Sequence, residues 1–186
     1  MNKFFSAKEQ HARGLVKNLK LPVAPEVWPF FEAGKKGDWT GMVGLYREMR
    51  RRSGQYAGTA SDAIVHTPVW QTVNETYSAY EAFAGMEVKF IDAFGLGVIE
   101  SIPRGSIYFG GTDPGRWLIT ALSRSHAEAN PFFTLTQNAL ADGTYLAYLR
   151  AMYGQRIAIP TDEDGKKAYE AYLAEAGPRL EKGELK

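Results

Sequence analysis

The chain has 186 residues, of which 45% are hydrophobic and 23% are charged, so it is long enough to bury a core and too apolar to stay disordered. Lysine and arginine number 22 against 21 aspartate and glutamate residues, and the net charge of +1 excludes a general attraction to nucleic acid or anionic membranes. The absence of cysteine excludes disulfides, thiolate metal sites and a cysteine nucleophile.

The start of the chain and its apolar runs give no membrane signal. Residues 1–13 contain one short apolar pair followed by charges, and they lack the apolar segment of a signal peptide. No apolar run reaches the length of a transmembrane helix. We therefore expect no membrane insertion, no nucleic-acid partner and a cytoplasmic location.

Residues 1–102 form the first predicted part of the chain, and this part is helical. After Asp38, apolar residues recur at spacings of three and four, which predicts a helix that Asp38 caps. A loop follows, and the next helix, after Pro68, carries an aromatic stripe that we expect in the core rather than as a stacking platform. A further helix is expected from about residue 87 to 101, with four apolar side chains directed inward: Phe90, Ile91, Phe94 and Ile99.

Residues 103–177 form the second predicted part of the same compact unit, and residues 178–186 form a charged tail. A strand, a polar loop and a helix are predicted three times in succession, with the strands at residues 106–109, 132–136 and 156–159. This alternation is typical of right-handed βαβ crossovers in a parallel sheet. The predicted fold class is therefore α/β, with the helical N-terminal part packed on a small three-stranded parallel sheet in a Rossmann-like arrangement.

The polar loops after the three predicted strands should meet at one edge of the sheet, where ligands of open α/β sheets bind. In the first loop, glycines permit close approach of the backbone to a ligand, and amides at a helix start attract anions. Its arginine would add a forked donor for phosphate or carboxylate, and two amide side chains in the second loop would orient a sugar, base or amide. The predicted ligand-binding residues are Gly110, Gly111, Thr112, Asp113, Gly115, Arg116, Gln137 and Asn138.

Ordinary structural explanations remain open for these residues. Asp113 suits a helix cap, the amide side chains suit a turn, and the acids at 161–164 suit the start of another helix. Three aspartates would hold Mg²⁺ if they met, but each suits a cap, and we predict no metal site: Asp113, Asp142 and Asp162. Three histidines are interpreted as surface or packing residues: His11, His66 and His126. Because no catalytic set is complete, the sequence assigns no reaction and no cofactor.

The segments PRGSIYFGGTDPGR and FTLTQNALADGTYLAYLRAMYG resemble a group of bacterial proteins of unknown function, some of which are labelled tetratricopeptide-containing. The resemblance runs from about Pro25 to Tyr172. From about Ser106 onward the chain is also similar, more distantly, to the soluble C-terminal region of multi-pass membrane proteins that look like glycosyltransferases. The resemblance implies that the chain is a shortened form of a longer protein and that seven residues are important: Gly110, Gly111, Asp113, Gly115, Arg116, Gln137 and Asn138. It supplies no catalytic residue.

Two functions are consistent with these patterns. The first is the binding of a small anionic or sugar-containing ligand at the ends of the strands. The second is a protein interaction module, in which the N-terminal helices bind a protein partner and the polar loops are only turns. A concave pocket at the strand ends would favour the first, and exposed apolar surface on the N-terminal helices would favour the second.

Overall fold

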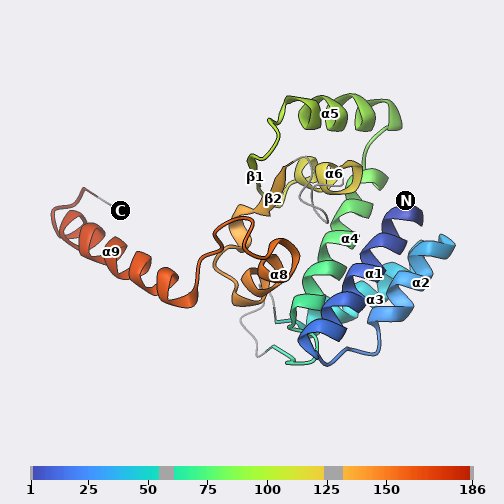
Figure 1. The fold of residues 1–186 in the computed structure, drawn as a ribbon, viewed down its shortest axis with the longest axis horizontal. Helices are drawn as coiled ribbons and strands as arrows, with labels where there is room; N and C mark the ends of the chain where they lie inside the picture. The colour runs from blue at the N-terminus through green and yellow to red at the C-terminus, as the bar shows by residue number, and fades with distance from the viewer. Residues whose placement is uncertain (1, 55–60, 124–131, 185–186) are drawn as a thin grey trace.

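A computed structural model of the chain describes residues 2–54, 61–123 and 132–184, which contain eight α-helices and one two-stranded parallel sheet (Figure 1). The helices of the N-terminal part are α1 (Asn2–Leu19), α2 (Val27–Lys36), α3 (Trp39–Arg52), α4 (Pro68–Ala84) and α5 (Val88–Ser101). They are followed by β1 (Ile107–Gly110), α6 (Pro114–Leu122), β2 (Phe133–Thr136), the 3-10 turn η1 (Gln137–Ala139), α8 (Gly143–Tyr153) and α9 (Asp162–Glu181). Across these three ranges, we find no helix with the length and apolar character needed to span a bilayer.

The predicted three-stranded, Rossmann-like α/β fold is wrong, because the protein is mostly helical and its sheet has two strands. The first two predicted strands are present and parallel, with Ile107 opposite Phe133 and Gly110 opposite Thr136. The third predicted strand, at residues 156–159, has no regular secondary structure. The sequence therefore predicted one parallel pair correctly and added a strand that the structure does not form.

The third strand is missing because the outer edge of β2 is already bonded to tyrosine side chains of α8. The hydroxyl of Tyr153 accepts a hydrogen bond from the N–H of Thr134 and donates one to its carbonyl, both at 3.0 Å. The hydroxyl of Tyr145 accepts from the N–H of Thr136 at 2.6 Å. A third strand would need these same backbone groups, and each is already paired. Arg156 instead donates to the carbonyls of Met152 and Tyr153 at the end of α8.

Stacked aromatic rings hold α3 against α4. Trp39 stacks on Tyr80 with ring centroids 4.9 Å apart, and Tyr46, further along α3, stacks on Tyr77 at 3.6 Å and on Trp70 at 5.5 Å. Because later residues of α3 meet earlier residues of α4, the two helices run antiparallel. The prediction that the aromatic stripe of α4 lies in the core is confirmed at Trp70 and Tyr77, which are buried.

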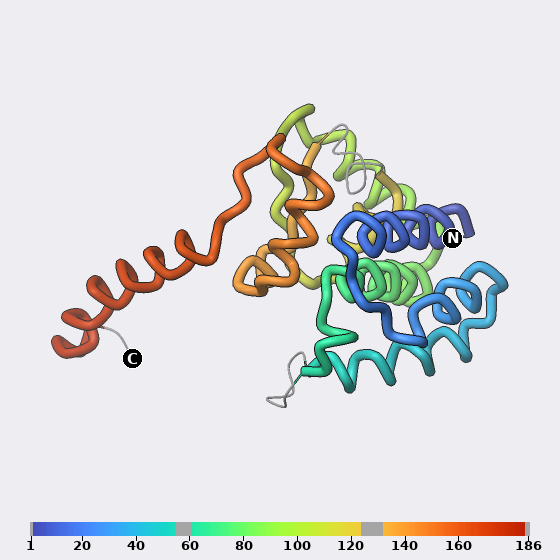
Figure 2. Tube along the Cα trace, turned by 60° about the horizontal axis from the view of Figure 1, so that its bottom comes forward, coloured from blue at the N-terminus to red at the C-terminus, as the bar shows by residue number. Residues whose placement is uncertain are grey.

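One hydrophobic core joins the helical part to the segment that follows it. Helix α4 runs through the middle of the molecule and packs on α1, α3, α6 and α8 (Figures 1 and 2). The core contains Phe5, Phe30 and Trp70 from the first part together with Leu135 and Leu149 from the second. Helices α1, α3, α6 and α8 are therefore packed around α4.

Helices α5 and α9 depart from this packing. On α5, Ile91 is buried as expected, whereas Phe90 and Phe94, which were also expected to point inward, are 56% and 50% exposed. Helix α9 projects away from the body as a single arm and contains no buried residue (Figures 1 and 2). It continues to Glu181, so residues 178–181, predicted as part of the tail, are helical. Both helices present apolar side chains to solvent.

Candidate functional site

The loop after β1 packs closely on the protein's own atoms. A Cβ atom at Gly110 would lie 2.3 Å from Cδ of Arg116, so the space that this glycine leaves is occupied by the arginine side chain. Asp113 caps α6, as the structural alternative expected, by accepting the N–H of Arg116 at 3.0 Å. The close approach of the backbone that we expected for a ligand is therefore made to Arg116 instead.

Arg116 itself lies in the interior, with 0% of its side chain exposed. Its guanidinium donates to the hydroxyl of Thr120 one turn later and to the hydroxyl of Thr136 at 3.1 Å. It also forms an ion pair with Glu75 at 3.8 Å. The forked donor that the sequence suggested for an anion is therefore directed at groups of the protein.

The structure brings the first two polar loops to the same edge of the sheet and leaves the third apart. Because Gly110 pairs with Thr136, the loop that includes Gly111 and the turn Gln137–Ala139 follow neighbouring strand ends. The side chains of Gln137 and Asn138 are exposed and form no hydrogen bond to another described residue. Residues 161–164 start α9, where Thr161 and Asp164 form a reciprocal capping box.

The three aspartates considered as magnesium ligands start three different helices. Asp113 caps α6, Asp142 caps α8 by accepting the N–H of Thr144 at 2.8 Å, and Asp162 is the first residue of α9. Within residues 2–54, 61–123 and 132–184, no three histidine, aspartate or glutamate side chains come close enough together to hold a metal ion. Capping accounts for the positions of Asp113 and Asp142.

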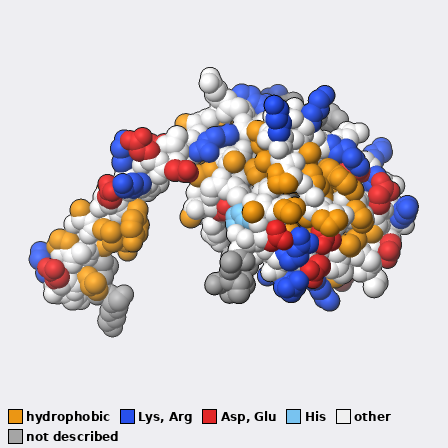
Figure 3. Space-filling view, turned by 90° about the horizontal axis from the view of Figure 1, so that it is seen from below, with side chains coloured by type: hydrophobic (Ala, Val, Ile, Leu, Met, Phe, Trp, Pro, Cys, Tyr) orange, Lys and Arg blue, Asp and Glu red, His pale blue; other side chains and the backbone are white. Residues whose placement is uncertain are grey.

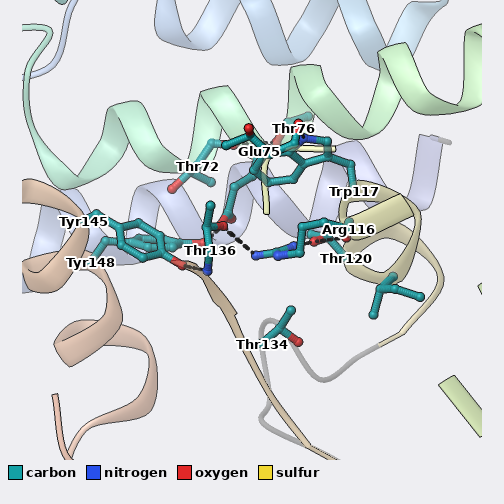
Figure 4. A network of polar contacts seen from close by, with 12 residues as sticks. Thr72, Glu75, Thr76, Arg116, Trp117, Thr120, Thr134, Thr136, Tyr145 and Tyr148 are labelled. Carbon is teal, nitrogen blue, oxygen red and sulfur yellow. Dashed lines mark hydrogen bonds and ion pairs between the residues drawn. The ribbon is translucent and has the colours of Figure 1, made fainter. Parts of the chain in front are cut away.

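A buried polar cluster surrounds Glu75 at the centre of α4 (Figure 4). Its Oε2 atom accepts hydrogen bonds from Nζ of Lys8 on α1 at 2.9 Å and from the hydroxyl of Tyr148 on α8 at 2.6 Å. Its other oxygen, Oε1, faces Arg116 of α6. Lys8 and Glu75 are 4% and 2% exposed. We refer to Lys8, Glu75, Arg116 and Tyr148 as the Glu75 cluster.

The Glu75 cluster holds two basic side chains against one carboxylate in a water-poor interior. Burial lowers the pKa of Lys8, although the neighbouring Glu75 acts in the opposite direction and Arg116 adds to the lowering. Burial also raises the pKa of the Tyr148 hydroxyl well above its usual value, and Glu75 adds to this effect. Tyr148 is therefore held protonated, as its donation to Glu75 requires.

The histidines show two environments. His11 packs its ring against Tyr148, with centroids 5.4 Å apart, and burial together with the charge of Lys8 lowers its pKa to about 4. His66 places one ring nitrogen 3.0 Å from the carbonyl of Ser53 and the other 3.7 Å from Asp142. His126 lies outside the described residues. The packing interpretation thus fits His11, and His66 joins the end of α3 to the start of α8.

A polar cleft of about 340 Å³ lies between α3, α4 and the loop that joins β1 to α6. Its volume is within the range of small-molecule sites. An adjoining hollow of about 220 Å³ shares four of its lining residues: Ser78, Glu81, Thr112 and Trp117. The remaining residues that line the cleft are Tyr46, Arg50 and Asn74. Among the predicted binding residues, Thr112 is the one that lines this cleft.

The cleft is positive at one end and negative at the other. Because α3 and α4 are antiparallel, Arg50, one turn beyond Tyr46, lies towards the start of α4, whereas Glu81 lies near its end. Arg50 is exposed and forms no ion pair with another residue of the described ranges. Glu81 accepts a hydrogen bond from Tyr77 at 2.9 Å, and burial raises the pKa of that tyrosine to about 12. A bound molecule would therefore meet the guanidinium of Arg50 at one end and the carboxylate of Glu81 at the other.

Sequence reasoning missed most of this cleft. Arg50 belongs to a run of three arginines to which the sequence analysis gave no role, and α4 was described only by its aromatic stripe. A second pattern on α4 would have helped: Asn74, Ser78 and Glu81 are spaced by four and three residues and therefore form one polar stripe. The pattern does not predict which residues face this stripe across the cleft, because Thr112 and Trp117 come from a distant part of the chain.

Replacement of Glu75 by glutamine tests the energetic role of the Glu75 cluster. The change leaves Lys8 and Arg116 buried without a counter-charge, and we expect the free energy of unfolding to fall by about 3–5 kcal/mol in urea denaturation. The matched control is Glu81→Gln on the exposed side of the same helix, which should cost less than about 1 kcal/mol. Equal losses in the two variants would contradict the role given to the buried carboxylate.

The depressed pKa of His11 predicts a pH dependence of stability. The unfolded chain binds a proton near the ordinary pKa of 6.5, whereas the folded chain resists it down to about 4. The free energy of unfolding should therefore fall as the pH is lowered through this interval, since the unfolded state binds more protons. In His11→Gln the free energy of unfolding should fall less steeply with decreasing pH, as measured by urea denaturation at several pH values. Parallel curves for the parent and the variant would show that His11 does not contribute.

The resemblance to bacterial proteins of unknown function and to glycosyltransferase-like proteins finds no support in comparisons with known proteins and stays a prediction. No protein-family model, no curated protein and no solved structure matched the chain. The geometry of the cleft is therefore the basis for a functional proposal.

Proposed function

We propose that the protein binds a small sugar-containing ligand with an anionic group in the cleft between α3, α4 and the loop after β1. The observation that carries this proposal is Arg50, which forms no ion pair with the residues that the structure describes and lies at one end of a polar cleft of about 340 Å³. Such a guanidinium is suited to phosphate or carboxylate, to which it donates two hydrogen bonds in parallel. Arg50 would hold the anionic group.

The polar stripe of α4 is suited to the hydroxyl groups of the same ligand. Asn74 offers an amide and Ser78 a hydroxyl, and Glu81 offers a carboxylate oxygen that accepts hydrogen bonds. Asn74 and Glu81 are seven positions apart on the helix, which separates them by about 10 Å along its axis. Glu81 would repel a second anionic group at its end, so the cleft favours ligands that are charged at one end.

Calorimetric titration with hexose phosphates, the uncharged hexoses and inorganic phosphate tests the proposal. We expect a hexose phosphate to bind more tightly than either component alone, and Arg50→Gln to weaken this binding by about 10-fold or more, because a charge-assisted hydrogen bond is lost. Arg51→Gln is the matched control, since Arg51 is the next residue but pairs with Glu48 outside the cleft. Absence of binding by every probe, or an equal effect of both substitutions, would refute the proposal.

A second candidate function, the binding of a protein partner, is favoured by the exposed side chains of α5. Four large apolar residues of this helix are at least 44% exposed: Val88, Phe90, Phe94 and Leu96. A cluster of this kind on a folded protein is typical of an interaction surface. The helix belongs to the N-terminal part, where this alternative placed the interface.

Two variants distinguish the candidates. If α5 binds a protein, Phe90→Glu should abolish capture of a specific partner from a lysate of the source organism and leave hexose phosphate binding unchanged. Phe90 is exposed, so its replacement should not unfold the chain. Arg50→Gln should weaken hexose phosphate binding and leave capture of the partner unchanged. If Phe90→Glu captures the same partner as the parent chain does, α5 is not the interface.

A further inference from the structure

Helix α9 exposes an apolar stripe between Tyr169 and Leu180. Four large side chains on it are at least 49% exposed and follow helical spacing: Tyr169, Tyr172, Leu173 and Leu180. Figure 3 shows hydrophobic side chains grouped along one side of this arm. The helix also contains two glycines and Pro178, which lower its intrinsic stability. A helix of this kind is stabilised mainly by packing of its apolar face, and no residue of α9 is buried in the single chain.

The charge of α9 restricts the surface that can cover the stripe. The helix has six acidic residues against three basic ones, a net charge of −3. All three basic side chains are already paired with glutamates of the same helix, which leaves the excess of negative charge uncompensated: Lys166 with Glu170, Lys167 with Glu163 and Arg179 with Glu175. A complementary surface is therefore apolar with a positively charged rim.

The protein has such a surface at the base of α9. An open groove of about 560 Å³ is lined by four small or apolar residues, one glutamine and one arginine: Gly154, Ile157, Ala158, Ile159, Gln155 and Arg150. Arg150 is the single charged residue among these, so the groove lining carries a positive charge. The groove thus matches the stripe of α9 both in apolar character and in sign of charge.

The helix is held away from the groove of its own chain. The groove ends at Ile159, and only Pro160 and Thr161 separate it from the first residue of α9. Arg150 donates a hydrogen bond to the carbonyl of Pro160, and the capping box of Thr161 and Asp164 fixes the start of the helix. For α9 to fold back onto the groove of its own chain, the backbone would have to reverse direction within Pro160 and Thr161, which these hydrogen bonds hold in place.

We propose that α9 docks into this groove on a second copy of the chain. Each copy carries both the helix and the groove, so two copies related by a two-fold axis cover both apolar faces at once and form a closed dimer. The exchange buries the stripe of α9 beside Arg150 of the other copy. The cleft near Arg50 is not involved, and the dimer does not depend on the ligand proposed for it.

Sedimentation equilibrium of the full chain tests the dimer. We expect a dimer in the micromolar range, and we expect Tyr172→Glu combined with Leu173→Glu to raise its Kd by about 30-fold or more, as loss of central interface contacts does. Both residues are exposed, so the fold should persist. Phe90→Glu, an equally exposed apolar position on α5, is the matched control and should leave the Kd unchanged. A monomeric parent chain, or a dimer that the α9 variant leaves intact, would overturn the proposal.

A mixing experiment identifies the groove as the docking site. Ala158→Glu places a negative charge in the groove and should also yield a monomer, since α9 is acidic. When the α9 variant and the groove variant are mixed, one intact helix meets one intact groove, and a heterodimer should form. Pairing of α9 with α9 predicts no heterodimer in the mixture, and docking of α9 at another site predicts a groove variant that dimerises like the parent. Either result would overturn the assignment of the groove.

Discussion

The structure depends on one buried carboxylate, Glu75, which lies at the centre of α4 and interacts with three other elements. Its oxygens meet Lys8 of α1, Tyr148 of α8 and Arg116 of α6. A charge in the interior is stable only when it is paired and hydrogen-bonded, so these elements must keep one arrangement relative to α4. The Glu75 cluster thereby fixes the position of the sheet, because Arg116 also donates to Thr136 of β2.

This arrangement explains why the sheet edge does not offer Arg116 to a ligand. The side chain of Arg116, just after the loop that follows β1, packs over Gly110 and points into the core. On the outer side of β2, the backbone groups are hydrogen-bonded to tyrosines of α8. A separate set of polar side chains lines the cleft between α3 and α4. The loop after β1 still contributes Thr112 to this cleft, so the proposed ligand site adjoins the sheet without lying on its edge.

Apolar surface in this protein is concentrated on the two helices that stand outside the packing around α4. The side chains of α5 and α9 repeat at helical spacing like those of buried helices, yet the single chain covers few of them. Exposed stripes of this kind are typical of surfaces that pack against another molecule. For α9, the groove at the base of the helix is a surface of matching character.

The sequence by itself determined the features that depend on neighbours within about one turn. Asp38, Asp113 and Asp142 accept backbone hydrogen bonds at helix starts, and the apolar periodicity after Asp38 and Pro68 corresponds to α3 and α4. Two β-prone runs became a parallel pair. These signals are local, because a cap or an amphipathic stripe is complete within its own segment.

Only the tertiary structure decided which of these segments meet and which side chains become buried. Arg116 is interior because a carboxylate on α4 faces it, and the third strand is absent because two hydroxyls on α8 occupy the backbone groups of β2. The cleft likewise combines α3 and α4 with a loop from another part of the chain. Pairing of distant polar groups depends on distance and burial, neither of which is present in local residue spacing.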